Sequence, residues 1–67
     1  MNVSKFHVDN IKDSNDIYAI RGEIQNIRGI HAVRVDDASN TITVEYEDEV
    51  SIDKITQAIN KHTNVRS

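Results

Sequence analysis

The side chains that could take part in chemistry are carboxylates and imidazoles. The 67 residues include 11 aspartates and glutamates and three histidines, but no cysteine. Without cysteine the chain has no thiolate for nucleophilic or redox chemistry, and soft-metal sites and the usual Cys/His zinc site are excluded. The carboxylates and histidines are acid–base material, but the sequence has neither a serine–histidine–aspartate constellation nor a phosphate-cradling glycine loop. We therefore do not expect an enzyme.

The net charge of −3 argues against nucleic-acid binding, because phosphate recognition needs a concentrated basic face. The eight lysines and arginines are scattered singly, whereas acidic residues gather at 36–37 and within 45–49. This acidic cluster has two interpretations. It is a solvated turn or strand edge, or it is an electrostatic face for a basic protein partner.

The length allows one domain, 1–67, close to the lower size limit for independent folding. No apolar run reaches the ~18–20 residues that cross a bilayer. The N-terminus also lacks the basic-then-apolar order of a signal peptide. We expect a cytoplasmic domain without membrane contact.

The spacing of apolar residues predicts the strands that must position these side chains. Apolar and polar residues alternate at 3–8, from Ile30 to Val35 and, most clearly, at 41–46. Only Val65 remains near the C-terminus to anchor a further strand. We therefore expect three strands and a last one that is short or absent.

Two segments follow the period of a helix instead. Ile17, Ile20, Ile24 and Ile27 fall on one helical face, and Gly29 provides a C-terminal stop. Ser51 is a suitable N-cap for a second helix, whose apolar face carries Ile52, Ile55, Ala58 and Ile59.

The resulting order, β-α-β-β-α-(β), predicts an α+β fold. It is the ferredoxin-like βαββαβ sandwich, an antiparallel sheet with two helices on one face. The other face stays open, with Lys5, His7, Thr43 and Glu45. RNA-binding sheets of this fold carry aromatic residues there, so we do not expect RNA binding. His7 and His31 both face this side, but ~10 Å apart on non-neighbouring strands, too far to share a metal.

The chain resembles the heavy-metal-associated domain of copper chaperones and copper-pumping ATPases. That family has a strand, then Gly-Met-x-Cys-x-x-Cys, then a helix. Asn10 and Ile11 fall where the family has glycine and methionine, and Asp13 and Asp16 fall where it has its two cysteines.

The likeness continues over nearly the whole chain. The family's Gly-Val-x-x-Val-x-Val-Asp hairpin looks like Gly29, Ile30, Val33 and Val35–Asp36. Its third strand and second helix look like Thr41–Tyr46, Val50–Ser51 and Ile55–Ile59. The resemblance implies the fold. It does not imply Cu(I) binding, because a carboxylate is a poor ligand for a soft ion.

Two interpretations of the substituted loop follow. In the first, Asp13 is the N-cap of the helix and Asp16 its third residue, so both carboxylates meet free backbone N–H groups. In the second, the metal has changed. The resemblance places the loop after the second helix near the metal loop, so Asp13, Asp16 and His62 could bind Zn(II), Mn(II) or Ni(II).

Our first functional hypothesis is a domain that has lost the Cu(I) thiolate site. It has no cofactor and acts by protein interaction in a metal-homeostasis or regulatory setting. The alternative is a metal-binding or transport protein with altered specificity for a divalent ion held by Asp13, Asp16 and His62. A third hypothesis is self-association through the sheet edge that a weak last strand leaves free.

Overall fold

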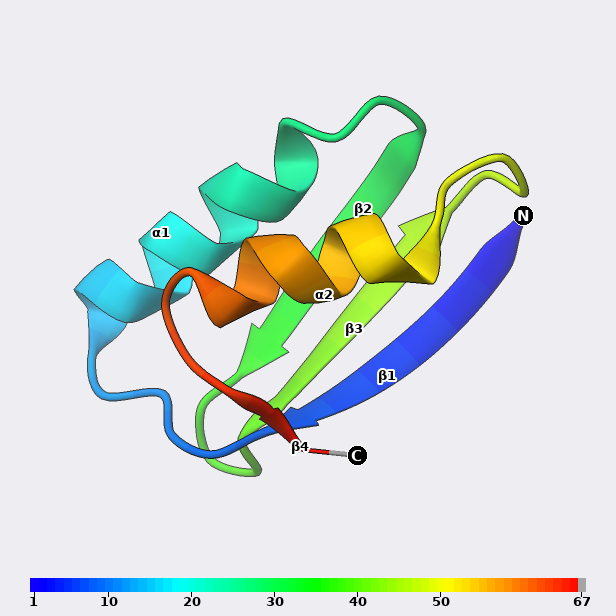
Figure 1. Ribbon diagram of the computed structural model, residues 1–67. Coiled ribbons are helices and arrows are strands. Elements are labelled where there is room, and N and C mark those ends of the chain that lie inside the picture. The colour runs from blue at the N-terminus through cyan, green and yellow to red at the C-terminus, as the bar shows by residue number, and fades with distance from the viewer. Residues whose placement is uncertain (67) are drawn as a thin grey trace.

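The computed structural model describes residues 1–66 and contains all the predicted elements (Figure 1). They are β1 (Asn2–Val8), α1 (Ser14–Gln25), β2 (Ile30–Asp36), β3 (Thr41–Tyr46), α2 (Ile52–Asn60) and β4 (Val65–Arg66). The last strand is present but has two residues, as the single Val65 predicted. No helix in this part of the chain is long and apolar enough to cross a membrane.

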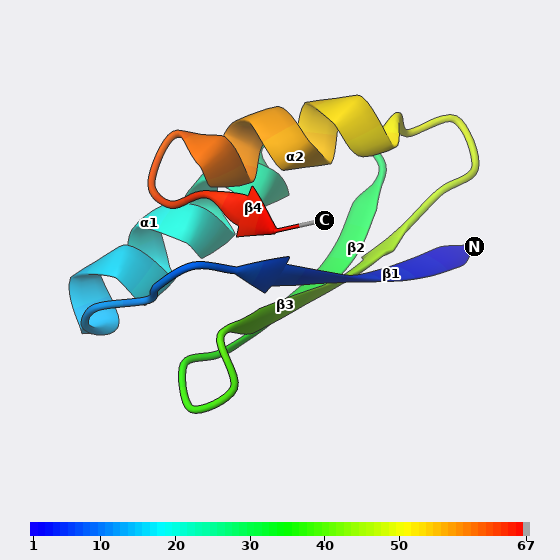
Figure 2. The same ribbon diagram turned by 60° about the horizontal axis from the view of Figure 1, so that its bottom comes forward.

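The sheet has the strand order β2-β3-β1-β4, and every neighbouring pair is antiparallel. Both helices lie on the same face of the sheet, and the opposite face is uncovered (Figure 2). The predicted ferredoxin-like sandwich is therefore confirmed. Because β3 lies between β1 and β2, His7 and His31 are on separated strands, as expected.

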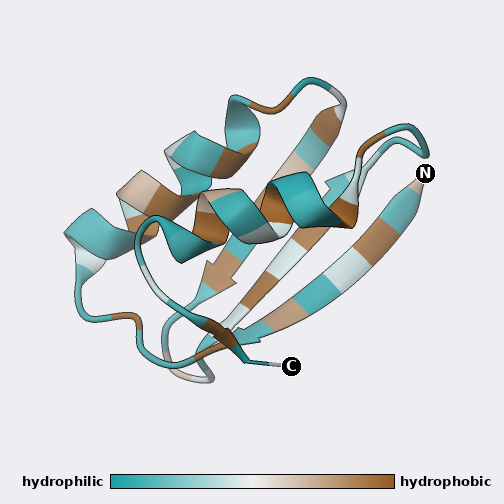
Figure 3. Cartoon of the chain, in the orientation of Figure 1, coloured by the Kyte–Doolittle hydropathy of each residue, from teal (hydrophilic) through white to brown (hydrophobic). Residues whose placement is uncertain are grey.

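The core lies between the helices and the sheet and is built almost entirely from β-branched residues. Its fully buried side chains are Ile20, Ile24, Ile42, Val44, Ile55 and Ile59. Brown hydrophobic bands alternate with hydrophilic ones along the strands (Figure 3). Isoleucine and valine suit this sheet and are tolerated in helices that pack on one.

Three residues depart from the predicted pattern. Ile52, expected on the core face of α2, is 51% exposed, because Val50 just before the helix is the buried residue at that end. Ile11, alone in a polar loop, is buried. Thr41, a polar residue of the alternating stretch 41–46, is also buried, and its hydroxyl forms a hydrogen bond of 2.8 Å with Ser39 Oγ.

Gly29 joins α1 to β2 in a conformation that a side chain would not tolerate. Its φ angle is +97°, and a Cβ atom placed there would lie 2.6 Å from Cγ2 of Val50. The backbone N–H of Glu47 also donates to the carbonyl of Gly29 at 2.9 Å, which fixes the junction. The turn therefore needs glycine both for its dihedral angle and for its space.

The two glycines of the chain make a matched pair for a stability test. We expect Gly29→Ala to lower the free energy of unfolding by roughly 2–3 kcal/mol, from left-handed strain and overlap with Val50. Gly22 lies inside α1 with nothing within 4 Å of its added Cβ, so Gly22→Ala should raise it by roughly 0.5–1 kcal/mol. Urea unfolding measures both. Equal effects of the two substitutions would contradict this account of the junction.

Candidate functional site

The segment that matches the family's metal loop connects β1 to α1, and its two aspartates contact the backbone. Asp13 is the N-cap of α1, with extended backbone, and its Oδ1 accepts a hydrogen bond from the N–H of Asp16 at 3.1 Å. Oδ2 of Asp16 accepts from the N–H of Lys12 at 3.1 Å. The two carboxylates thus satisfy backbone donors at the helix start in a reciprocal arrangement like a capping box. The predicted cap is observed.

The rest of this loop is anchored from two sides. Ile11 is buried, and its N–H donates to Oδ1 of Asn40 at 3.2 Å. Thr63 Oγ1 donates to the carbonyl of Asn10 at 2.8 Å, and the N–H of Asp9 donates to the carbonyl of Asn64 at 2.9 Å. The loop is therefore held by the β2–β3 turn on one side and by the segment before β4 on the other.

His62, the third predicted ligand, contacts α1 instead. Its Nε2 lies 3.8 Å from Oε1 of Glu23, while Lys61 Nζ lies 3.2 Å from Oε2 of the same carboxylate. The structure thus brings Asp13 and Asp16 together and places His62 beside Glu23. Among residues 1–66, no three histidine or carboxylate side chains are grouped closely enough to hold a metal ion.

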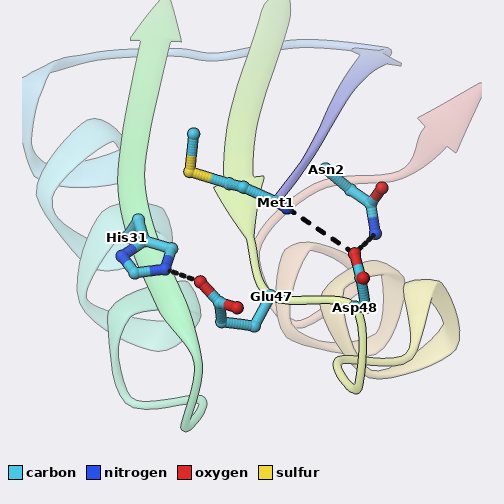
Figure 4. A network of polar contacts seen from close by, with 5 residues as sticks. All are labelled: Met1, Asn2, His31, Glu47 and Asp48. Atoms are coloured by element: carbon cyan, nitrogen blue, oxygen red, sulfur yellow. Dashed lines mark hydrogen bonds and ion pairs between the residues drawn. The ribbon is translucent and has the colours of Figure 1, made fainter.

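The acidic stretch between 45 and 49 lies at the opposite end of the sheet from β4 (Figure 1). Two of its members have partners within the chain (Figure 4). Glu47 contacts the Nε2 atom of His31. Asp48 accepts from the side-chain amide of Asn2 at 2.9 Å and lies 3.7 Å from the N-terminal ammonium of Met1. Because these partners belong to the same chain, the contacts favour the interpretation of this stretch as a solvated turn or strand edge over that of a face for a basic partner.

The basic residues that look scattered in the sequence meet in one place. A groove of about 450 Å³ between α1 and α2 is lined by Arg28, Lys54 and Lys61, with Glu23 as its single acid. Lys54 lies in α2 and Lys61 is its C-cap, seven residues further on, so both lie on the same side of this helix, a signal the sequence contained. Arg28 lies beyond the end of α1, and only the fold brings it to the groove.

The family model for the heavy-metal-associated domain matches residues 5–67. The chain belongs to this family. No curated protein sequence gave a significant match.

Several solved structures share the fold. The "CopZ metallochaperone" superposes with a TM-score of 0.92 at 19% identity, covering 97% of this chain and all of that one. The N-terminal domain of a potential copper-translocating P-type ATPase from Bacillus subtilis, in the Cu(I)-loaded state, gives 0.87 at 21% identity, covering 96% and 82%. Oxidized MerP from Ralstonia metallidurans CH34 gives 0.83 at 18%, covering 98% and 97%. At these identities the likeness shows the fold alone.

The donor set of this heavy-metal-associated domain does not fit Cu(I). Its two cysteine positions hold hard carboxylate oxygens, which are poor ligands for a soft ion. Both carboxylates also already accept backbone hydrogen bonds. The carboxylates of this loop therefore act as the N-terminal cap of α1.

The capping role predicts how substitutions at Asp13 differ. Asp13→Ala removes the acceptor for the N–H of Asp16 and should lower the free energy of unfolding by about 1 kcal/mol. Asp13→Asn keeps a side-chain oxygen at the cap and should cost clearly less. Urea unfolding in metal-free buffer compares the two. If both substitutions had the same effect, or none, the hydrogen bond would not be what Asp13 contributes.

Proposed function

We propose that this heavy-metal-associated domain acts by binding another protein and has given up the transfer of Cu(I). The observation that carries the proposal is that both cysteine positions hold aspartates whose carboxylates cap α1. The scaffold is kept, as the match over residues 5–67 shows, while the ligands are replaced. A cytoplasmic role in metal homeostasis or its regulation agrees with this combination.

The proposal predicts that the domain lacks Cu(I) binding only because Asp13 and Asp16 replace two cysteines, so that cysteines introduced at these positions should restore it. In competition with a colorimetric Cu(I) chelator, we expect the native domain to take no Cu(I). The variant Asp13→Cys/Asp16→Cys should take about one equivalent, because two thiolates then stand at the matching positions of the same scaffold. Tight Cu(I) binding by the native domain that Asp13→Ala abolishes would overturn the proposal.

The alternative function is a carrier of a divalent ion held by Asp13, Asp16 and His62. It would require both carboxylates to leave their backbone donors and His62 to leave Glu23. Such a site would have two carboxylates and one imidazole without supporting hydrogen bonds to orient them. Saturable binding of Zn(II), Mn(II) or Ni(II) at this loop would favour this function over ours.

The groove between the helices is the surface we assign to the protein partner. It places three cations around one carboxylate on a chain whose net charge is −3, so its local charge is opposite to that of the molecule. Lys61 is engaged by Glu23, and Arg28 and Lys54 make no ion pair within residues 1–66. This charge pattern suits an acidic segment of another protein.

An acidic peptide tests this assignment. We expect a short polyglutamate peptide to shift backbone amide signals at 23–28 and 54–61, with an affinity that falls as salt rises. Lys54→Glu should weaken it about five-fold, roughly the worth of one exposed ion pair. The control Lys12→Glu reverses an exposed charge in the β1–α1 loop and should leave binding unchanged. Shifts spread evenly over the molecule would count against the groove.

A further inference from the structure

β2 is an edge strand of the sheet. β2 is the first strand in the order β2-β3-β1-β4, so one side pairs with β3 and the other with no strand of residues 1–66 (Figure 1). By contrast, the two residues of β4 cover one end of β1 at His7 and Val8. An edge strand of seven residues carries unpaired backbone donors and acceptors that can pair with another strand.

The register shows which backbone groups point outward. The N–H of Val8 donates to the carbonyl of Asn40. In the antiparallel register, the backbone N–H and C=O groups of the even-numbered residues of β1 and of β3 therefore point toward each other. The backbone groups of the odd-numbered residues of β3 therefore point toward β2. The hydrogen bond from the N–H of Glu47 to the carbonyl of Gly29 follows the same alternation.

The residues of β2 opposite them are Ala32, Arg34 and Asp36, whose backbone groups point at β3. Val33 and Val35 alternate with these, so their N–H and C=O groups point to the open edge.

The side chains of β2 favour one way for this edge to pair with a copy of itself. Arg34 and Asp36 are both exposed, flank Val35 and carry opposite charges. If two β2 strands pair antiparallel with Val35 opposite Val35, Arg34 of each copy lies opposite Asp36 of the other. Opposite charges across a strand pair stabilise it, and here the pair forms twice.

The other registers that pair the outward groups are disfavoured. Pairing Val33 with Val35 puts Arg34 opposite Arg34 of the copy, and like charges directly opposite are destabilising. Pairing Val33 with Val33 puts Arg34 opposite Ala32 and brings the copy onto the irregular step between Ile30 and Ala32. Only the register centred on Val35 combines outward backbone groups with matched charges.

The free part of the β1 edge fits a second copy less well. By the same alternation Val3 and Lys5 point outward there. The register that pairs Val3 with Lys5 places Met1 of the copy opposite His7, where Arg66 of β4 already pairs.

Asp36 is suited to the ion pair because it stays charged. The Ser39 side chain, together with the backbone N–H groups of Ser39 and Ala38, holds the pKa of the Asp36 carboxyl below its ordinary value. The hydrogen bond from the N–H of Ala38 to Oδ1 is 3.0 Å long and also fixes the side chain. At neutral pH the carboxylate is therefore ionised and held at the end of the strand.

We propose that two copies of this domain associate through antiparallel pairing of their β2 strands, centred on Val35, with Arg34 of each copy opposite Asp36 of the other. The two sheets then form one continuous sheet with all four helices on one side. The contact consists of a few backbone hydrogen bonds, the two Val35 side chains and two exposed ion pairs. Because it is small, the dimer is weak and reversible.

Charge reversal tests both the association and its register. Sedimentation equilibrium of the native domain from about 10 μM to 1 mM should show a mass that rises from monomer toward dimer, as expected of a weak contact. Arg34→Asp and Asp36→Arg should each move this rise to at least about ten-fold higher concentration. An equal mixture of the two variants should regain native association, because each reversed residue then meets an opposite charge.

The double variant Arg34→Asp/Asp36→Arg should also associate like the native domain, since its charges are exchanged but still matched. Because the double variant also lacks the hydrogen bond from the N–H of Ala38 to Asp36, it shows whether a loss of association in Asp36→Arg comes from the altered turn or from the reversed charge. Asp53→Arg, an exposed charge reversal on α2, which does not contact β2, should change nothing. A monomer at every concentration, or an association that neither single reversal weakens, would overturn the proposal. So would single variants that fail to rescue one another.

Discussion

The start of α1 depends on two carboxylates that accept hydrogen bonds from the backbone. The carboxylate of Asp13 accepts a hydrogen bond from the N–H of Asp16, and the carboxylate of Asp16 accepts one from the N–H of Lys12. This cap begins the helix that carries Ile20 and Ile24 into the core over the sheet. A domain of 67 residues with no cysteine has neither a disulfide nor a structural thiolate–metal site to replace such local interactions. Asp13 and Asp16, at the positions of the family's two cysteines, therefore stabilise the start of α1 in this chain.

Some charged side chains of the molecule form contacts within the chain, and others do not. Glu47, Asp48 and Glu23 all have partners within the chain, at His31, at Met1 and Asn2, and at Lys61 and His62. The groove between the helices carries Arg28 and Lys54, and the edge strand β2 carries Arg34, none of which makes an ion pair within residues 1–66. We assign interaction with other chains to these two surfaces, which lie on different elements of the fold.

The fold could be predicted because its signals are periodic. The isoleucines of α1 and the alternation of β3 repeat over several residues, and the single Val65 correctly predicted a minimal last strand. Ile11 and Val50 were missed as core residues because a single apolar residue in a polar loop has no period. The Asp13 cap was predictable because a cap is local in sequence. The contact of His62 with Glu23, and the approach of Arg28 to Lys54, depend on how distant segments pack.

The central claim is that the Asp13 and Asp16 carboxylates serve the backbone and not a metal. It is tested most directly by following the backbone amide signals of Lys12 and Asp16 while Zn(II), Mn(II) or Ni(II) is added, with paramagnetic effects used as the readout for the latter two. These N–H groups donate to the two carboxylates, so a metal that drew the oxygens away would change both signals together. The account predicts that neither signal responds in a saturable way to any of the three ions. Coupled, saturable changes at Lys12 and Asp16, accompanied by His62, would contradict it.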